Sequence, residues 1–373
     1  MKVTIHKLFD YLLETTKEVP EAVLGLSLAR APMLGDFLGD LDPALPLDWN
    51  GVSFQGLPAL RGHVLARARL EDLCDIGDVL ITAGAAEANY LVLRQLLRPG
   101  DEMVIEAPGW PQAEVMARAM GITVRRVARD EAAGWALPLE ALEAAVGPAT
   151  RLIFLTNPNN PSGALLTGDE LARIAAIADR VGAYVLVDEV YAGLEWASQR
   201  APSIAGIYAR GITTGSVSKA LGLQGLRTGW MICRDRGLIM DAVILRENSS
   251  EIMNILGEVI AEVALRPDRY DAAIATARAE GAANLGLLDA FIAGQARLSW
   301  QRPAAGLIGL VRLDRIDGEV LARRLLEPPY RTFLLPGSAY DCPSHIRLGV
   351  GGGPAVRLEV GLERLAQLLA TWE

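Results

Sequence analysis

The chain has 373 residues, of which 51% are hydrophobic and 22% are charged, and its formal net charge is -9 at pH 7. A chain of this length and composition can bury a sizeable core and is expected to divide into two domains. The acidic balance argues against nucleic acid and against an anionic membrane as partners, because both are themselves negatively charged.

The cysteines and histidines bear on two questions, the cellular compartment of the protein and whether it binds a metal. Cys74, Cys233 and Cys342 are dispersed and odd in number, which indicates reduced thiols and not a disulfide framework. The stretch from Met1 to His6 lacks the long apolar run of a secretory signal, so we expect a cytoplasmic protein. None of the three histidines lies near a cysteine pair, and we therefore expect no metal site.

A first helix of the central region is predicted to open within residues 82–88 and to stop at residues 99–100, a Pro-Gly pair. Its apolar positions at helical spacing are Ala86, Tyr90, Leu93 and Leu97. Small residues at a helix start leave N–H groups free for a phosphate, and Ala85 and Ala86 are placed to offer them. A tight loop packed for its own sake explains these residues equally well.

Short apolar runs then alternate with helical stretches, as they do in βαβ units. The predicted strands are residues 103–105, 152–155, 184–187, 211–217 and 229–233. Thr167 and Glu170 form a predicted capping box at the start of a helix. The apolar face of that helix is Leu171, Ile174, Ala175 and Ala178.

The last third of the chain is predicted to form a smaller unit. Helices over residues 247–265 and 271–292 lead to strands at 307–311 and 347–350, and a helix over 355–373 closes the chain. No internal repeat or low-complexity tract interrupts this order. We therefore predict an N-terminal segment (1–48) that packs with the small domain, a large domain (49–270) and a C-terminal small domain (271–373).

Polar clusters follow three of the predicted strands. Residues 156–163 follow the strand at 152–155, residues 188–191 follow the strand at 184–187, and Lys219 comes just after the strand at 211–217. Ligands of open α/β sheets bind at the carboxyl ends of the strands. The three clusters are therefore expected to converge on one crevice.

Lys219 carries the most specific chemistry. It follows small hydroxyl residues, and Arg227 comes eight positions later. This arrangement is suited to an imine with a phosphorylated aldehyde whose phosphate the guanidinium binds. A Ser-x-Ser-Lys string alone also occurs on solvated surfaces. The two upstream clusters favour the functional interpretation.

Pyridoxal phosphate is such an aldehyde, and it acts as an electron sink only while its ring nitrogen stays protonated. A buried carboxylate beside that nitrogen favours the charged form, and Asp188 is the candidate. An amide and a phenol, Asn160 and Tyr191, would stabilise the ring oxyanion. Taken singly, Asn160 could be a turn residue and Asp188 a helix N-cap, but the ordered set with Lys219 favours a cofactor site.

These motifs resemble those of fold-type I pyridoxal-phosphate enzymes of the class I/II aminotransferase family, with some similarity to the capreomycidine synthase-like subgroup. The resemblance runs from about Gly56 to the last helix and is strongest at residues 157–163, 188–191 and 216–229. It implies an α/β fold in which a three-layer sandwich with a mostly parallel central sheet is joined to a smaller α+β domain.

The resemblance also implies a role for each matched residue. Lys219 would be the Schiff-base lysine and proton shuttle, and Asp188 would pair with the pyridine nitrogen. Asn160 and Tyr191 would contact the ring hydroxyl, and Tyr191 is counted with the catalytic residues. The implied phosphate ligands are Ser216, Ser218, Arg227 and the backbone of Ala85 and Ala86.

Two further side chains match family positions. Trp110 follows the strand at 103–105, where the family stacks an aromatic ring on the cofactor, although a tryptophan is more often core or interface. Arg347 lies in a segment, residues 344–349, that resembles the family's C-terminal arginine motif, and it offers a bidentate partner for a substrate carboxylate. Asn160 would also contact the substrate. The alternative for Arg347 is a salt bridge between domains.

The chain departs from the family at its N-terminal side. The family places a tyrosine, which reaches the partner subunit's phosphate, shortly before the segment that reads here as residues 56–61, but residues 49–54 contain none. Trp49, Asn50 or Ser53 substitutes for it, or the contact is missing. The first fifty residues also match poorly, and the sequence leaves their role open.

The resemblance implies a pyridoxal-phosphate-dependent aminotransferase that moves the α-amino group of an amino acid to a 2-oxo acid through a Lys219 Schiff base. It also implies a homodimer. Elimination or cyclisation, oxidase and carbon–sulfur lyase chemistry stay open, and the motifs identify neither the amino acid nor the acceptor. A regulator's sensor domain is disfavoured, because the first fifty residues offer no helix-turn-helix or basic cluster.

Overall fold

The computed structural model describes residues 3–15, 20–48, 53–197, 199–352 and 356–372. Two of the residues predicted to replace the missing tyrosine, Trp49 and Asn50, lie outside these ranges. No helix in the described part of the chain is long and apolar enough to span a membrane.

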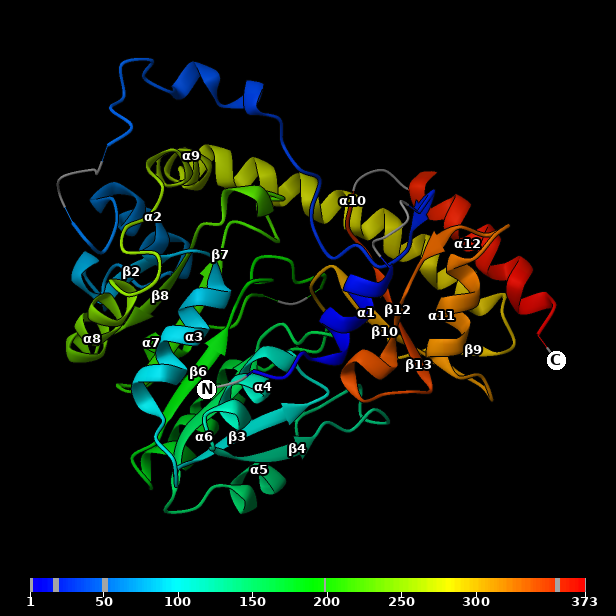
Figure 1. Ribbon diagram of the computed structural model, residues 1–373, viewed down its shortest axis with the longest axis horizontal. Coiled ribbons are helices and arrows are strands. Elements are labelled where there is room, and N and C mark those ends of the chain that lie inside the picture. The colour runs from blue at the N-terminus through cyan, green and yellow to red at the C-terminus, as the bar shows by residue number, and fades with distance from the viewer. Residues whose placement is uncertain (1–2, 16–19, 49–52, 198, 353–355, 373) are drawn as a thin grey trace.

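A central sheet organises the larger part of the molecule (Figure 1). Within the described residues it has seven strands in the order β2-β8-β7-β6-β5-β3-β4. Their bounds are β2 Val79–Thr82, β3 Glu102–Ala107, β4 Thr123–Ala128, β5 Thr150–Thr156, β6 Tyr184–Asp188, β7 Gly211–Ser216 and β8 Gly229–Cys233. Only β8 runs antiparallel to its neighbours, β2 and β7. The expectation of a mostly parallel sheet is confirmed.

Helices cover both faces of this sheet. The helices are α2 Pro58–Ala68, α3 Ala85–Leu96, α4 Pro111–Ala119, α5 Leu139–Ala145, α6 Gly168–Asp179, α7 Ile204–Ile207, α8 Arg236–Arg246 and α9 Ile255–Leu265. Helices α3, α4 and α8 share one apolar cluster with the sheet, and α5, α6 and α7 share another on the alternate side chains of the same strands. Because parallel strands are buried on both faces, they read as the continuous apolar runs seen in the sequence. The three-layer sandwich is confirmed.

The smaller unit is built around an antiparallel sheet in the order β12-β13-β10-β9. Its strands are β9 Leu298–Trp300, β10 Ile308–Leu313, β12 Leu335–Pro336 and β13 His345–Gly349, with helices α11 Gly318–Leu326 and α12 Val356–Ala370. The long helix α10, Pro267–Ala293, runs from the larger part into this unit (Figure 1).

The N-terminal segment packs on the smaller unit. Its helix α1, Lys7–Thr15, buries Leu8 and Tyr11 in the same apolar cluster as the small sheet, and Tyr11 Oη donates to Leu334 O at 3.0 Å. Strand β1, Ala22–Val23, pairs in parallel with β11, Thr332–Phe333. The domain boundaries at 48/49 and 270/271 stay a prediction.

Two helix predictions need correction. The helix expected over residues 247–265 begins only at Ile255, where the Asn254 side chain accepts from Gly257 N, and a separate helix α8 ends at Arg246. Residues 248–250 are Asn-Ser-Ser, whose side chains compete with the backbone for hydrogen bonds and so interrupt the helix. The capping box of α6 at Thr167 and Glu170 is as expected.

The apolar face predicted for α3 is also partly wrong. Ala86 is exposed and Tyr90 is half-buried, whereas Ala88, Asn89 and Leu91 are buried, together with Val92. The predicted apolar spacing is therefore about one residue out of phase near the start of the helix. Because of this shift, the predicted apolar face leaves out a buried polar residue, Asn89.

Candidate active site

A cavity of about 420 Å³ lies where the carboxyl ends of β5, β6 and β7 meet the N-terminal segment and the smaller unit. This volume falls within the range of roughly 300–1,000 Å³ typical of small-molecule sites. Its lining includes every residue predicted from the sequence to belong to the site: Ala85, Ala86, Trp110, Asn160, Asp188, Tyr191, Ser216, Ser218, Lys219, Arg227 and Arg347.

Lys219 follows β7 and reaches into the cavity with its Nζ 3.5 Å from Ser27 Oγ. Burial, together with the positive charges of Arg347 and Arg227, lowers the pKa of its ammonium group to about 8, although Asp188 opposes this shift. The chain has only four lysines, and Lys219 is the single one beyond residue 17. A neutral, nucleophilic amine is thus available near neutral pH.

Asp188 ends β6 and is 4% exposed. Its carboxylate accepts from Asn89 Nδ2 at 2.8 Å and from Val190 N at 3.2 Å. Burial raises the pKa of Asp188 to about 6, although these two donors and Lys219 favour the ionised form. Within the described residues this carboxylate forms no ion pair, so it is suited to a cationic N–H donor in the cavity.

Asn89 also lines the cavity and was not among the site residues predicted from the sequence. It is 1% exposed on α3, it donates to Asp188, and its Oδ1 accepts from Thr214 Oγ1 of β7 at 2.9 Å. It comes four positions after Ala85, so both project from the same face of the helix. A polar residue on the otherwise apolar inner face of α3 was the signal that could have revealed it.

Arg347 lies in β13 and is 5% exposed. Its Nη1 donates to Tyr340 Oη at 2.6 Å and to Asn160 Oδ1 at 3.3 Å, and its Nη2 donates to Gly25 O at 3.0 Å. The buried Nε has no hydrogen-bond partner, and among the described residues no carboxylate pairs with this guanidinium. The salt bridge between domains is therefore not found, and the arginine faces the cavity as an unpaired cation.

Tyr191 and Asn160 lie near this arginine. The Tyr191 hydroxyl is buried and meets no hydrogen-bond partner with normal geometry in the described chain, although Ser27 lies close to it. Burial raises the pKa of Tyr191, so the phenol stays protonated and can donate. Asn160 is fixed by its contact with Arg347. The two side chains offer donors to an oxyanion in the cavity.

The start of α3 and the loop after β7 form an anion-binding corner. The first N–H groups of a helix have no acceptor within it, which leaves those of Ala85 and Ala86 open. The Arg227 guanidinium lies against Gly84, where an added Cβ would stand 2.7 Å from Nη2. Gly84 also has φ +83°, a conformation that favours glycine. With the hydroxyls of Ser216 and Ser218, these donors suit a phosphate.

Trp110 presents its ring to the cavity from the loop between β3 and α4. Its Nε1 donates to Gln112 Oε1 at 3.3 Å, and Gln112 Nε2 donates to Ala86 O at 2.7 Å. The indole is therefore tied to the start of α3 and held in one orientation.

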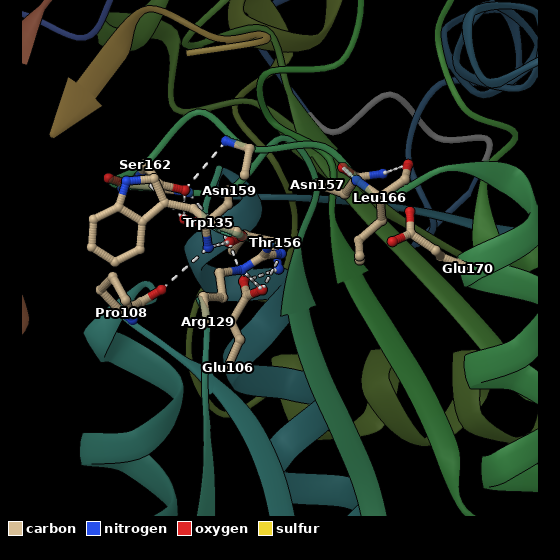
Figure 2. A network of polar contacts seen from close by, with 12 residues as sticks. Glu106, Pro108, Arg129, Trp135, Thr156, Asn157, Asn159, Ser162, Leu166 and Glu170 are labelled. Carbon is tan, nitrogen blue, oxygen red and sulfur yellow. Dashed lines mark hydrogen bonds and ion pairs between the residues drawn. The ribbon is translucent and has the colours of Figure 1, made fainter. Parts of the chain in front are cut away.

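A buried polar network supports the loop that carries Asn160 (Figure 2). Glu106 accepts from Arg129 and from both the backbone N and Oγ1 of Thr156, at 2.7 and 2.6 Å for the latter pair. Asn159 Nδ2 donates to Pro108 O and Asn159 Oδ1 accepts from Ser162. The loop after β5 is thus fixed to β3 by satisfied polar contacts.

Asn89→Ala removes the side-chain donor to Asp188. Because a hydrogen bond to a charged group contributes about 1.5–3 kcal/mol, we expect pyridoxal phosphate to bind about 10- to 150-fold more weakly to this variant. A spectroscopic titration of the apo-protein measures the dissociation constant. Arg94→Ala, on the same helix but outside the cavity lining, is the control. Equal affinities in the two variants would contradict the role of Asn89.

The depressed pKa of Lys219 gives a pH dependence. Below about pH 8 the amine is protonated and cannot attack an aldehyde, and above it the amine is neutral. The rate of covalent pyridoxal phosphate attachment to the apo-protein should therefore rise with pH, with a midpoint near 8 by stopped-flow absorbance. Arg347→Ala should move the midpoint upward, because it removes a charge that disfavours the ammonium form. An unmoved midpoint in this variant would argue against that coupling.

Comparison with known proteins is consistent with this geometry. The family described as aminotransferase class I and II matches residues 50–365. The aspartate aminotransferase of Streptomyces avermitilis is 32% identical over 184 residues, which are 48% of this chain and 45% of that protein. A probable N-succinyldiaminopimelate aminotransferase of Mycobacterium tuberculosis is 36% identical over 159 residues, 41% of this chain and 40% of that protein. The chain thus spans less than half the length of these curated relatives.

Solved structures extend the similarity to the whole chain. A PLP-dependent aminotransferase from Streptococcus suis superposes with a TM-score of 0.91 at 26% identity and covers 100% of this chain and 99% of that chain. A PLP-dependent cyclase, OrfR, superposes with a TM-score of 0.87 at 25% identity and covers 99% of this chain and 98% of its own. With the family match over most of its length, the chain belongs to the aminotransferase class I and II family.

Proposed function

We propose that this chain is a pyridoxal-phosphate-dependent aminotransferase that moves the α-amino group of an amino acid to a 2-oxo acid. One observation carries the proposal. A single cavity combines a lysine whose pKa is lowered to about 8, a buried carboxylate and a buried guanidinium, the last two without ion-pair partners among the described residues. Active sites concentrate such perturbed groups.

The residues present fit the cofactor that the family implies. Lys219 would bind its aldehyde carbon covalently, Asp188 would accept the ring N–H, and Asn160 and Tyr191 would donate to the ring hydroxyl. Trp110 would cover one face of the ring. The anion-binding corner would hold the phosphate through Ala85, Ala86, Ser216, Ser218 and Arg227. When bound, the cofactor supplies an electron sink that stabilises negative charge at the α-carbon of the substrate.

The chain's own groups would perform the remaining work. Arg347 would bind the α-carboxylate through its fork of N–H donors and so fix the α-carbon in place, and Asn160 would contact the same carboxylate. Lys219, once its Nζ is free, would take the α-proton as a neutral amine and return it elsewhere as an ammonium group. Its pKa of about 8 makes both steps accessible near neutral pH.

The second candidate keeps the cofactor and changes the outcome. The PLP-dependent cyclase OrfR superposes over almost the whole chain, which favours elimination with ring closure over oxidase or carbon–sulfur lyase chemistry as this second candidate. Amino acid added to the cofactor-loaded protein without an acceptor separates transamination from cyclisation. Stoichiometric conversion of the cofactor to its amino form supports transamination, and continuous turnover that releases ammonia or a cyclised product supports the second candidate.

We propose further that the protein is a homodimer and that it works in the cytoplasm. The chain between α1 and α2 exposes several large apolar side chains that a second copy would cover: Leu34, Leu38, Leu47 and Phe54. Whether Ser53 replaces the missing tyrosine contact also stays a prediction. Light scattering that finds an active monomer would refute the dimer.

Lys219→Ala should lose covalent cofactor attachment and essentially all turnover, because no other lysine among the described residues lines the cavity. Borohydride reduction followed by peptide mapping is decisive, since the other three lysines, Lys2, Lys7 and Lys17, all lie near the N-terminus. Lys7→Arg, which keeps the charge that pairs with Asp341, is the control. Cofactor fixed to the Lys219→Ala chain would disprove the assignment and, with it, the proposed function.

Arg347→Ala should raise the Michaelis constant for the amino acid about 30- to 150-fold, which corresponds to about 2–3 kcal/mol for an unmade charge-assisted contact. Cofactor absorbance should change little, because no cofactor ligand is removed. Arg312→Ala on the neighbouring strand β10, where the side chain is half-exposed and pairs with Glu131, is the control. Equal Michaelis constants in the two variants would place the carboxylate elsewhere.

A further inference from the structure

The N-terminal segment and the smaller unit form one wall of the cavity, and apart from Ser27 and Arg347 the side chains of this wall are apolar. The apolar wall comprises Leu8, Leu12, Val23, Leu26, Phe333 and Leu335. Leu8 and Leu12 are four residues apart on α1, so they project from one face of that helix. Val23 and Phe333 are paired across β1 and β11. Three separate segments of the chain therefore present hydrocarbon to the same space.

This wall is held in position from behind. Tyr11 Oη donates to Leu334 O at 3.0 Å, and Leu8 and Leu335 belong to the buried core of the smaller unit. Lys7 pairs with Asp341 at 2.7 Å at the start of α1. These contacts of Lys7 and Tyr11 tie α1 to the smaller unit, so the helix holds its part of the apolar wall in place.

Every ionisable side chain in the lining already has a task in the proposed reaction. The only acidic one is Asp188, and the cationic ones are Lys219, Arg227 and Arg347. Among the described residues, none remains to pair with a charge on a substrate side chain. An unpaired charge enters an apolar wall only at a high free-energy cost, whereas an apolar group gains from leaving water.

We propose that the amino acid substrate carries an uncharged, apolar side chain, of the leucine, methionine or phenylalanine type, an inference that rests on the proposed function. Its α-carboxylate binds Arg347 and its side chain packs against the apolar wall, with Leu12 as the specificity-determining residue at the rim. This differs from the dicarboxylic substrate in the name of the aspartate aminotransferase relative. The same wall disfavours cationic side chains such as that of arginine.

Binding of unreactive carboxylic acids tests the inference without turnover. Calorimetry on the cofactor-loaded protein would compare 4-methylpentanoate and 3-phenylpropanoate with succinate, glutarate and 5-guanidinopentanoate. We expect the two apolar acids to bind at least about 10-fold more tightly, since pocket contacts of this kind discriminate by about 10- to 200-fold. Tighter binding of either dicarboxylate or of the guanidino acid would overturn the proposal.

A pair of variants adds a kinetic test. In single-turnover experiments, the observed rate constant is divided by the substrate concentration. Leu12→Arg should lower this ratio for L-leucine and raise it for L-glutamate, each by about 10-fold. Leu13→Arg places the same charge on an exposed neighbour, 51% accessible and outside the lining, and should leave both unchanged. Equal responses of the two variants, or a wild-type preference for L-aspartate, L-glutamate or L-arginine over L-leucine, would also overturn it.

The outcomes separate this inference from the proposed function. If no amino acid converts the cofactor but the apolar acids still bind more tightly, the transaminase proposal fails and the apolar site stands. If L-glutamate or L-arginine is converted fastest, the transaminase proposal stands and the apolar site fails.

Discussion

Buried charges that lack counter-ions are the constraint on which this structure depends. Asp188 and Arg347 are 4% and 5% exposed, and neither has an ion-pair partner in the described part of the chain. Burying a charge in this state is costly unless hydrogen bonds offset the loss of water. Asn89 and Val190 supply them for the carboxylate, and Tyr340 and Gly25 supply them for the guanidinium. Each charged group thereby keeps unfilled hydrogen-bonding capacity on the side that faces the cavity.

The pair Glu106 and Arg129 shows the contrast. It is as deeply buried, at 2% and 0% side-chain exposure, but Glu106 accepts from Arg129 at 2.7 Å and also from Thr156, whose loop it fixes. A pair whose hydrogen bonds are satisfied within the fold has no hydrogen-bonding group left for a ligand. Its role is to hold the loop after β5, which carries Asn160, in place (Figure 2). Burial alone therefore does not mark a functional charge. Unfilled hydrogen-bonding capacity beside a cavity does.

The sequence predicted which residues gather at the cavity better than it predicted their surroundings, for a physical reason. Asp188 ends β6, and Asn160 and Lys219 come within four residues of the ends of β5 and β7. The parallel arrangement brings these strand ends together whatever the rest of the chain does. Asn89 instead owes its place to the rotation of α3 about its axis, which the misjudged apolar positions Ala86 and Tyr90 were enough to hide. The helix break before Ile255 and the apolar wall likewise depend on tertiary packing, which local patterns do not record.

The divergent N-terminal segment couples the two halves of the site. Ala29 N donates to Lys219 O at 2.9 Å on the large-domain side, and Gly25 O accepts from Arg347 on the other. The segment between Gly25 and Ala29 lies so close to β13 that a Cβ at Gly349 would stand 1.9 Å from Leu26 O, so only glycine fits at position 349. One short segment therefore touches the backbone of the lysine, the side chain of the arginine and the apolar wall, and it links the loop after β7 to β13 through its own backbone.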